Sequence, residues 1–259
     1  MTSISLTANS FSFPFPCLRD AAGYGILTNP NESAPMLYLP FESEAFLWKL
    51  APDTPLWIYV VPDASEETLL SILSTVDALL HAGTLGSCIV QPKLCRLLSL
   101  SFPDRISSVT TMRSMYCPSP RPFRSDASIL PAAAVPYGSI LRLMQVFLPK
   151  ETDEAQRVSA ATRFTECERA FALKADDTIV SLGKIAWSNE SFSLINDIVT
   201  TPEARNRGYM KTLLSHLLTL VWNGSLPILY VDETNEAAKH VYRSVGFWDG
   251  ILLKTVLFS

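Results

Sequence analysis

The fold of this protein is decided by the stretch DIVTTPEARNRGYMKTLL, residues 197–214. It starts as the end of an apolar strand, turns at Thr-Thr-Pro and continues into an amphipathic helix, with Arg205, Arg207 and Lys211 around Gly208. The first N–H groups of a helix have no intrahelical partner and carry the positive end of the helix dipole, so they attract anions. Gly208 lets a ligand approach the backbone closely because it has no Cβ. The stretch therefore predicts an anion-binding site at the start of a helix.

The three cations favour a bound ligand over a merely solvated helix face. Cations at a helix N-terminus oppose the helix dipole and cost up to about 1 kcal/mol when no anion is present. The chain as a whole has a net charge of −4, so these cations do not belong to a broad basic surface. Such a local cluster fits a small anionic ligand and argues against nucleic acid as a partner.

A second motif follows at residues 229–247, LYVDETNEAAKHVYRSVGF. An apolar strand leads to Asn235, a short helix carries Tyr242, and Gly-Phe ends the segment. Tyr242 comes seven residues after Asn235, or two helical turns, so both side chains can lie on one face of the helix. The purely structural alternative makes Tyr242 a core residue and Asn235 an ordinary N-cap.

Together the two motifs point to a known family. Arg205-x-x-Gly208-x-Met210, after a strand that ends in Ile-Val-Thr, resembles the acyl-CoA signature of the Gcn5-related N-acetyltransferase (GNAT) superfamily, which is Gln/Arg-x-x-Gly-x-Gly/Ala. Residues 229–247 are similar to that family's segment of strand, Asn, helix, Tyr and Gly-Phe, and they follow in the family's order. The resemblance extends from residue 139 to the C-terminus. It implies an α/β fold with a mixed, mostly antiparallel central sheet flanked by helices.

The resemblance also implies a cosubstrate, acetyl-CoA, and the residues that bind it. The pantetheine arm would pair with the backbone of Ile198, Val199 and Thr200 like an added strand, and Asn235 would bind the same arm. The pyrophosphate would accept hydrogen bonds from the main chain at the helix start, where the cations add charge. The residues concerned are Arg205, Asn206, Arg207, Gly208, Tyr209, Met210 and Lys211.

The expected reaction is transfer of an acetyl group from acetyl-CoA to a primary amine of a small molecule or peptide. The resemblance makes Tyr242 the general acid. A tyrosine, with a pKa near 10, can protonate a leaving thiolate whose pKa is about 8.5. No cysteine falls within the two motifs to carry the acyl group, so we expect direct attack by the amine in a ternary complex.

Two positions depart from the family pattern. Several members have a Glu as general base five residues before the Asn, where this chain has Tyr230. Asp232 on the same strand and Asp197 on the preceding strand are substitutes, and a water chain or an already neutral amine would need neither. The other departure is Met210 where Gly or Ala is usual, which bears on cofactor affinity and acyl-chain preference.

Two other functions stay open. The missing Glu and the presence of Met210 fit a non-catalytic acyl-CoA-binding or regulatory module, whereas Tyr242 argues for an enzyme. The cationic cluster also fits another phosphorylated ligand.

The composition is that of an ordinary globular protein. Apolar residues make up 48% of the chain and charged residues 18%, which argues against extensive disorder. No apolar run is long enough to cross a membrane, and the N-terminus shows no secretory signal pattern, so we expect a cytoplasmic location without membrane association. Five cysteines without Cys-x-x-Cys spacing and three scattered histidines predict reduced thiols and no metal site.

The length suits two domains, which we place at residues 1–125 and 137–259. Residues 118–136 are rich in Pro, Ser and Ala and form the best linker candidate. In the first half we expect strands at 25–28, 36–39, 56–61, 87–90 and 108–117, a helix capped by Asp63 or Ser65 that ends before Gly83, and a helix at 92–102. The buried stripe of the first helix would be Leu69, Leu70, Ile72, Leu73, Val76, Leu79 and Leu80.

In the second half, residues 139–147 fit either a strand or a helix, and one or two helices fit within 151–172. We expect strands at 170–175, 178–187, 192–200, 226–231 and 250–258, and helices at 206–222 and 235–245. Both halves share the order strand, helix, strand, helix, strand, so the first half is interpreted as an α/β domain and a candidate degenerate copy of the same fold. Its turn at 62–67 carries acids and no glycine, so a copy would have lost the anion site.

Overall fold

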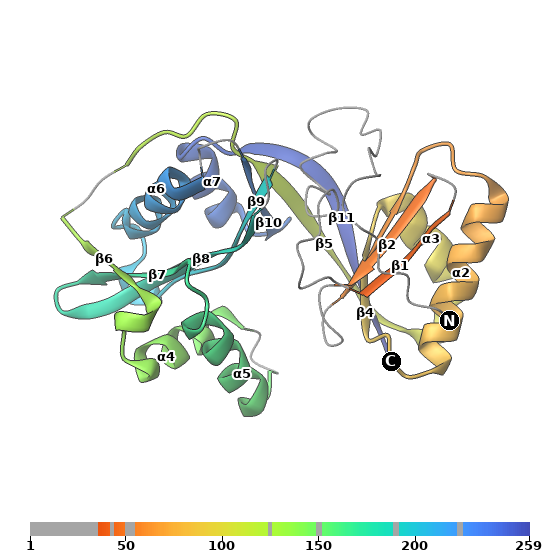
Figure 1. Ribbon diagram of the computed structural model, residues 1–259, viewed down its shortest axis with the longest axis horizontal. Coiled ribbons are helices and arrows are strands. Elements are labelled where there is room, and N and C mark those ends of the chain that lie inside the picture. Colours follow the sequence, from red (N-terminus) through yellow and green to blue (C-terminus); the bar gives the residue numbers. More distant parts are fainter. Residues whose placement is uncertain are drawn as a thin grey trace. The chain divides into compact units, whose positions relative to one another are not determined.

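The structure, a computed structural model, describes residues 36–41, 44–49, 55–123, 126–148, 152–188, 192–221 and 225–259. The chain forms two compact units, each visible in Figure 1. Of the described residues, the first unit contains those up to Ser114 together with Val231–Thr234 and Gly250–Ser259, and the second contains those within 115–230 and 235–249. The chain therefore passes between the units more than once. The strand predicted at 25–28 lies outside the described residues.

The first unit is built on strands in the order β1-β2-β3-β4-β11-β5. β1 (Met36–Phe41), β2 (Ala45–Lys49) and β3 (Leu56–Val60) are antiparallel neighbours, whereas β3 and β4 (Ser87–Val90) run parallel. β11 (Trp248–Phe258) pairs antiparallel with β4, and β5 spans Ile106–Tyr116. The sequence pattern did not predict β2.

The helices of the first unit follow its parallel strands. α2 (Glu66–His81) comes after β3, and α3 (Pro92–Ser101) comes after β4 and is followed by the short 3-10 helix Pro103–Arg105. Ile72 and Val76 of α2 are fully buried, as predicted, but Leu70 is 59% exposed, so the prediction that it is buried is wrong. Leu70 lies two residues from Ile72, which is about 200° around the helix axis, and therefore points away from the core.

The second unit is built on strands in the order β10-β9-β8-β7-β6. β6 (Ser128–Pro131), β7 (Ala170–Ala175), β8 (Thr178–Ser188) and β9 (Phe192–Thr200) form an antiparallel meander, and β10 (Leu226–Asp232) runs parallel to β9. β6 and the 3-10 helix Ala132–Ala134 lie within the segment predicted as a linker.

Helices cover both faces of the strands of the second unit, with α6 (Tyr209–Val221) and α7 (Glu236–Ser244) on one face and α4 (Tyr137–Phe147) and α5 (Glu154–Thr165) on the other (Figure 1). The ambiguous residues 139–147 are helical, because Ile140, Leu143 and Met144 have helical spacing and are all fully buried. The predicted fold class is confirmed: a mixed, mostly antiparallel sheet flanked by helices. None of the helices in the described residues is long and apolar enough to cross a membrane.

Candidate functional site

The parallel strands β9 and β10 separate as they approach the cationic cluster. Their pairing joins residues 226–228 to residues 192–194 and ends there. Beyond that point β9 keeps its neighbour β8, with Val199 opposite Leu182 and Thr200 opposite Ser181. Among the described residues, the end of β9 therefore has a strand partner on one side only. The other side is open to an extended ligand that adds to it like a strand.

A β-bulge at Asp197 lies where the opening starts. Lys184 faces Asn196 and Leu182 faces Val199, so β9 has one more residue than β8 in this interval. Asp197 has a left-handed φ of 52°, and its carboxylate lies 2.6 Å from the Lys184 ammonium, with both side chains mostly buried. As a general base, Asp197 would have to give up this ion pair.

The loop after β9 leaves its backbone donors free. The short 3-10 helix Pro202–Ala204 leads into residues 205–211, which we call the cationic loop. Asn206 and Gly208 have positive φ angles of 62° and 80°, and the N–H of Thr212 donates the first bond of α6 to the Gly208 carbonyl at 3.0 Å. Within the described part of the chain, the N–H groups of residues 206–211 have no acceptor. These are the donors that an anion at a helix start uses.

The three cations of the loop are available to a ligand. Arg205 and Arg207 are exposed and Lys211 is half-buried. Arg205 donates through Nε to the Thr200 carbonyl at 3.4 Å, and the Lys211 ammonium lies 5.7 Å from the centre of the Phe123 ring. In the residues that the structure describes, none of the three pairs with an acidic side chain. The loop thus combines free donors with uncompensated positive charge.

The other residues of the predicted anion site lie at the start of α6. Tyr209 is the first residue of that helix and packs beside the buried Ala204 and Leu213, and Met210 is half-buried next to it. The structure therefore brings residues 205–211 together with the open edge of β9, as the sequence predicts.

Asn235 and Tyr242 lie on α7. The Asn235 side chain accepts a hydrogen bond from the N–H of Ala238 at 3.0 Å, so in the free protein it is the N-cap of α7. Tyr242 is only 6% exposed, and its ring lies 6.0 Å from that of Phe247. Burial raises the pKa of Tyr242, so its phenol stays protonated in neutral solution.

The remaining acid–base candidates are engaged or unsuited. The Asp232 carboxylate accepts hydrogen bonds from the N–H and hydroxyl of Thr234 at 2.7 and 2.5 Å. Burial raises the pKa of Tyr230, the residue at the position where we expected a general base by resemblance to several GNAT members. Burial also raises the pKa of the Cys117 thiol to about 12, which keeps it from acting as a nucleophile.

At the start of α2 in the first unit, a carboxylate of the protein itself accepts several hydrogen bonds. The Glu44 carboxylate accepts hydrogen bonds from the N–H and hydroxyl of Ser65 at 2.9 and 2.7 Å and from the Thr68 hydroxyl at 2.6 Å. Nearby, the side chain of Gln91 accepts a hydrogen bond from the N–H of Val60 at 3.0 Å. Sequence reasoning missed Glu44 and Gln91, because nothing in the local pattern pairs them with groups more than one element away.

The structure thus defines an α/β protein in which an open strand edge lies next to a glycine-containing cationic loop at a helix start. Comparison with known proteins narrows the class of protein further. Residues 139–247 match the family model described as Acetyltransferase (GNAT) family, so this segment is a GNAT acetyltransferase domain. The family resemblance predicted from the two motifs is thereby confirmed.

Solved structures share the fold over most of the chain. A putative GNAT acetyltransferase from Novosphingobium aromaticivorans is 16% identical with a TM-score of 0.52, over 82% of this chain and 87% of that one. A GCN5-related N-acetyltransferase from Kribbella flavida is 12% identical with a TM-score of 0.58, over 86% and 89%. A tandem GNAT protein from the clavulanic acid biosynthesis pathway is 13% identical with a TM-score of 0.50, over 82% and 77%. At these identities the likeness shows the fold alone. Comparison with curated protein sequences gives no match.

Proposed function

We propose that this protein is an N-acyltransferase that transfers an acetyl group from acetyl-CoA to a primary amine. Its GNAT relatives support acyl transfer in general. The observation that carries the finer proposal is the open start of α6, where free N–H donors and three cations lie beside an unpaired strand edge. A cosubstrate with an extended amide-containing arm and a pyrophosphate fits both features at once.

In this proposal the pantetheine arm pairs with the backbone of Ile198, Val199 and Thr200, and Asn235 bonds the same arm. The pyrophosphate accepts hydrogen bonds from the N–H groups of residues 206–211. The charges of the loop cations strengthen those bonds, since hydrogen bonds to ionised groups are stronger than neutral ones. The acceptor is an amine of a small molecule or a peptide.

The reaction needs one nucleophile and one proton donor. The neutral amine attacks the thioester carbonyl, a C–N bond forms, and the C–S bond breaks. Tyr242 gives its phenolic proton to the leaving sulfur, and the proton lost by the amine passes to water, from which Tyr242 is reprotonated. Because burial raises the pKa of Tyr242 well above that of a thiol, proton delivery accompanies C–S cleavage rather than preceding it. No acyl-cysteine intermediate is involved.

A second candidate function is non-catalytic binding of acyl-CoA. Its support is specific: Asp197 is held in an ion pair, Asp232 accepts two hydrogen bonds from Thr234, and burial makes Tyr242 a weaker acid. Such a module would bind the cofactor at the same loop and have no amine acceptor.

We further propose that the first half of the chain is a degenerate copy of the same fold, with domains at residues 1–125 and 137–259. Its parallel strands β3 and β4 are followed by α2 and α3, as β9 and β10 are followed by α6 and α7. The tandem GNAT protein matched above has a comparable fold over 82% of this chain.

A calorimetric titration of acetyl-CoA into the whole chain tests the proposal. Binding near 1 μM, about −8 kcal/mol, is the expected result. Replacing Arg205, Arg207 and Lys211 together by alanine should weaken binding about 100-fold, because each exposed charge contact contributes about 1 kcal/mol. Absence of heat with the intact chain would refute the acyl-CoA site.

A matched control removes three exposed cations elsewhere: Lys93, Arg96 and Arg163, all changed to alanine. This variant has the same change in net charge and should bind acetyl-CoA like the intact chain. An equal loss in both triple variants would mean that overall charge, not the loop, attracts the ligand. A screen of amines with thiol release as readout then separates the enzyme from the binding module.

A further inference from the structure

The segment between β5 and β6 is held against α6 and α7. Residues 117–123, which we call the crossing segment, start with a hydrogen bond from the Cys117 N–H to the Pro227 carbonyl at 2.9 Å. The N–H of Arg121 donates to the Val245 carbonyl at the end of α7, also at 2.9 Å. The crossing segment then reaches the middle of α6.

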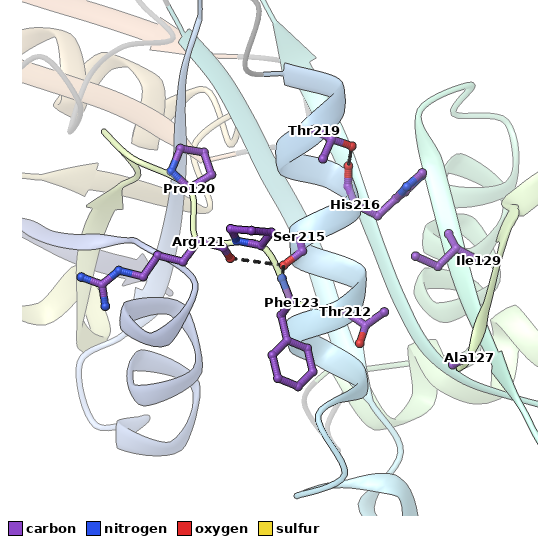
Figure 2. Close-up of a pocket in the computed structure, with 10 residues that line it drawn as sticks. Pro120, Arg121, Phe123, Ala127, Ile129, Thr212, Ser215, His216 and Thr219 are labelled. Atoms are coloured by element: carbon purple, nitrogen blue, oxygen red, sulfur yellow. Dashed lines mark hydrogen bonds between the residues drawn. The ribbon is translucent and has the colours of Figure 1, made fainter. Parts of the chain in front are cut away.

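Ser215 on α6 fixes the end of the crossing segment. Its hydroxyl accepts a hydrogen bond from the Phe123 N–H at 2.8 Å and lies 3.5 Å from the Arg121 carbonyl oxygen, to which it donates (Figure 2). This double contact directs the Phe123 side chain toward the N-terminal end of α6, beside Thr212 (Figure 2).

The Phe123 ring occupies the space that the missing side chain of Gly208 leaves. A Cβ on Gly208 would lie 2.9 Å from the Phe123 Cε1 atom and 3.0 Å from its Cζ atom. The ring also has the Lys211 ammonium 5.7 Å from its centre, within the range of a cation–π interaction. The face of Gly208 that the absent Cβ leaves open to a ligand is therefore covered by an aromatic ring in the free protein.

We propose that Phe123 gates the cationic loop: its ring closes the Gly208 face in the free protein, and the phosphate end of the cosubstrate binds only after the ring has moved away. This inference rests on the proposed function, and it adds a residue that sets cofactor affinity. When the ring moves away, the Lys211 ammonium loses its contact with the ring and contacts the phosphate instead. The apparent affinity is reduced by the fraction of molecules in which the gate is open.

The surroundings allow the ring to move. Phe123 is 38% exposed, and its bond to Ser215 comes from the main chain, so rotation of the side chain leaves that bond intact. A pocket of about 420 Å³ lies next to the ring, between the crossing segment, β6 and α6 (Figure 2). Ala127 and Ile129 give it an apolar wall. The pocket offers a place for the ring when the loop is occupied.

The test is a calorimetric titration of acetyl-CoA into the whole chain and into the variant Phe123→Ala. Removing the gate should tighten binding about tenfold, since no ring has to be displaced. Leu220→Ala is the matched control, because Leu220 is a 44% exposed apolar residue near the other end of α6. It should leave the affinity unchanged. Unchanged or weaker binding by Phe123→Ala would overturn the gate.

The outcomes also separate the gate from the proposed function. Equal binding by both forms overturns the gate and leaves the acyl-CoA site standing, whereas absence of binding by both overturns the two together. A direct probe is 4-fluorophenylalanine at position 123, observed by fluorine NMR. Addition of acetyl-CoA should shift its resonance in a saturable way, and a resonance that stays fixed while calorimetry shows binding would overturn the gate.

Discussion

The first and second units both place a helix after each of two parallel strands, β3 and β4 in the first and β9 and β10 in the second. At the start of α2 a side chain of the protein itself, Glu44, accepts hydrogen bonds from the N–H and hydroxyl of Ser65 and from the hydroxyl of Thr68. At the start of α6 the corresponding donors are free and cations replace the carboxylate. The same arrangement is therefore closed by an internal anion in one unit and left open for an external anion in the other.

The difference extends to the strands and the second helices. At the end of β3, the Gln91 side chain accepts a hydrogen bond from the N–H of Val60. At the end of β9, no side chain among the described residues accepts a hydrogen bond from the backbone on the open side. Seven residues after the N-cap of α3 stands the buried Leu98, and seven residues after the N-cap of α7 stands Tyr242. Glu44, Gln91 and Leu98 thus mark three positions at which the first unit differs from the second, which carries the candidate catalytic site.

The largest expected effect is on turnover. Replacing Tyr242 by Phe keeps the ring and removes the proton donor, so kcat should fall about 100-fold or more while the affinity for acetyl-CoA is unchanged. Because the raised pKa of Tyr242 keeps the phenol protonated, we expect no alkaline loss of rate from this group below about pH 10. The rate of thiol release, measured as a function of pH, checks the fall in kcat and the absence of an alkaline loss. Unchanged turnover would favour the binding module.

The next prediction separates the backbone strain of a positive φ angle from a steric clash with a neighbouring side chain. Gly208 and Gly83 both have positive φ angles, 80° and 65°, but only a Cβ on Gly208 would meet another residue, Phe123. Changing Gly83 to Ala should lower the free energy of unfolding by about 1 kcal/mol through strain alone. Changing Gly208 to Ala should lower it by about 2 kcal/mol and weaken acetyl-CoA binding as well. Urea unfolding and calorimetry measure the pair, and equal losses would contradict the close contact.

A smaller effect concerns the two helix caps. Ser65 and Asn235 each accept a hydrogen bond from the backbone of their own helix, at 3.2 and 3.0 Å. Alanine at either position should lower the free energy of unfolding by about 1 kcal/mol. Only Asn235→Ala should also weaken acetyl-CoA binding, by up to about tenfold. A loss of binding with Ser65→Ala would show that the first unit takes part in the site.

The smallest effect at neutral pH concerns Glu44. The hydroxyl of Thr68, then the hydroxyl and N–H of Ser65, lower the pKa of Glu44 below its ordinary value of 4.5. A carboxylate whose pKa is lowered on folding stabilises the protein above the unfolded pKa, and this stabilisation is lost as the pH falls through the folded pKa. Glu44→Gln should therefore destabilise the protein at pH 7, and the difference should shrink below pH 4.5. Thermal unfolding at pH 7 and pH 3 checks the sign.

Most elements could be predicted from the sequence because their apolar residues repeat with a clear period. The exceptions are instructive. β2 spans only Ala45–Lys49, too short a run to show a clear period, and β6 ends in Pro131, a residue that sheets accept at their edges. Leu70 follows Leu69 directly, and a run of adjacent leucines does not show which one faces the core.

The candidate site likewise contains residues that could be predicted from the sequence and residues that could not. Residues 205–211 could be predicted because the helix start, the glycine and the cations are neighbours in the sequence. In the first unit, the side chains of Glu44 and Gln91 accept hydrogen bonds from residues 21 and 31 positions away. Phe123 reaches the loop from a segment whose bond to Ser215 joins residues 92 positions apart. Contacts of this kind depend on the tertiary fold and leave no local pattern.

The most direct test of the central claim is hydrogen exchange of the two helix starts, followed by mass spectrometry with and without acetyl-CoA. Residues 205–211 should exchange rapidly in the free protein and become protected when acetyl-CoA is added, because their N–H groups gain the phosphate as acceptor. Residues 61–69, at the start of α2, should show no change. Protection at the start of α2, or none at the start of α6 when binding is saturated, would contradict the account.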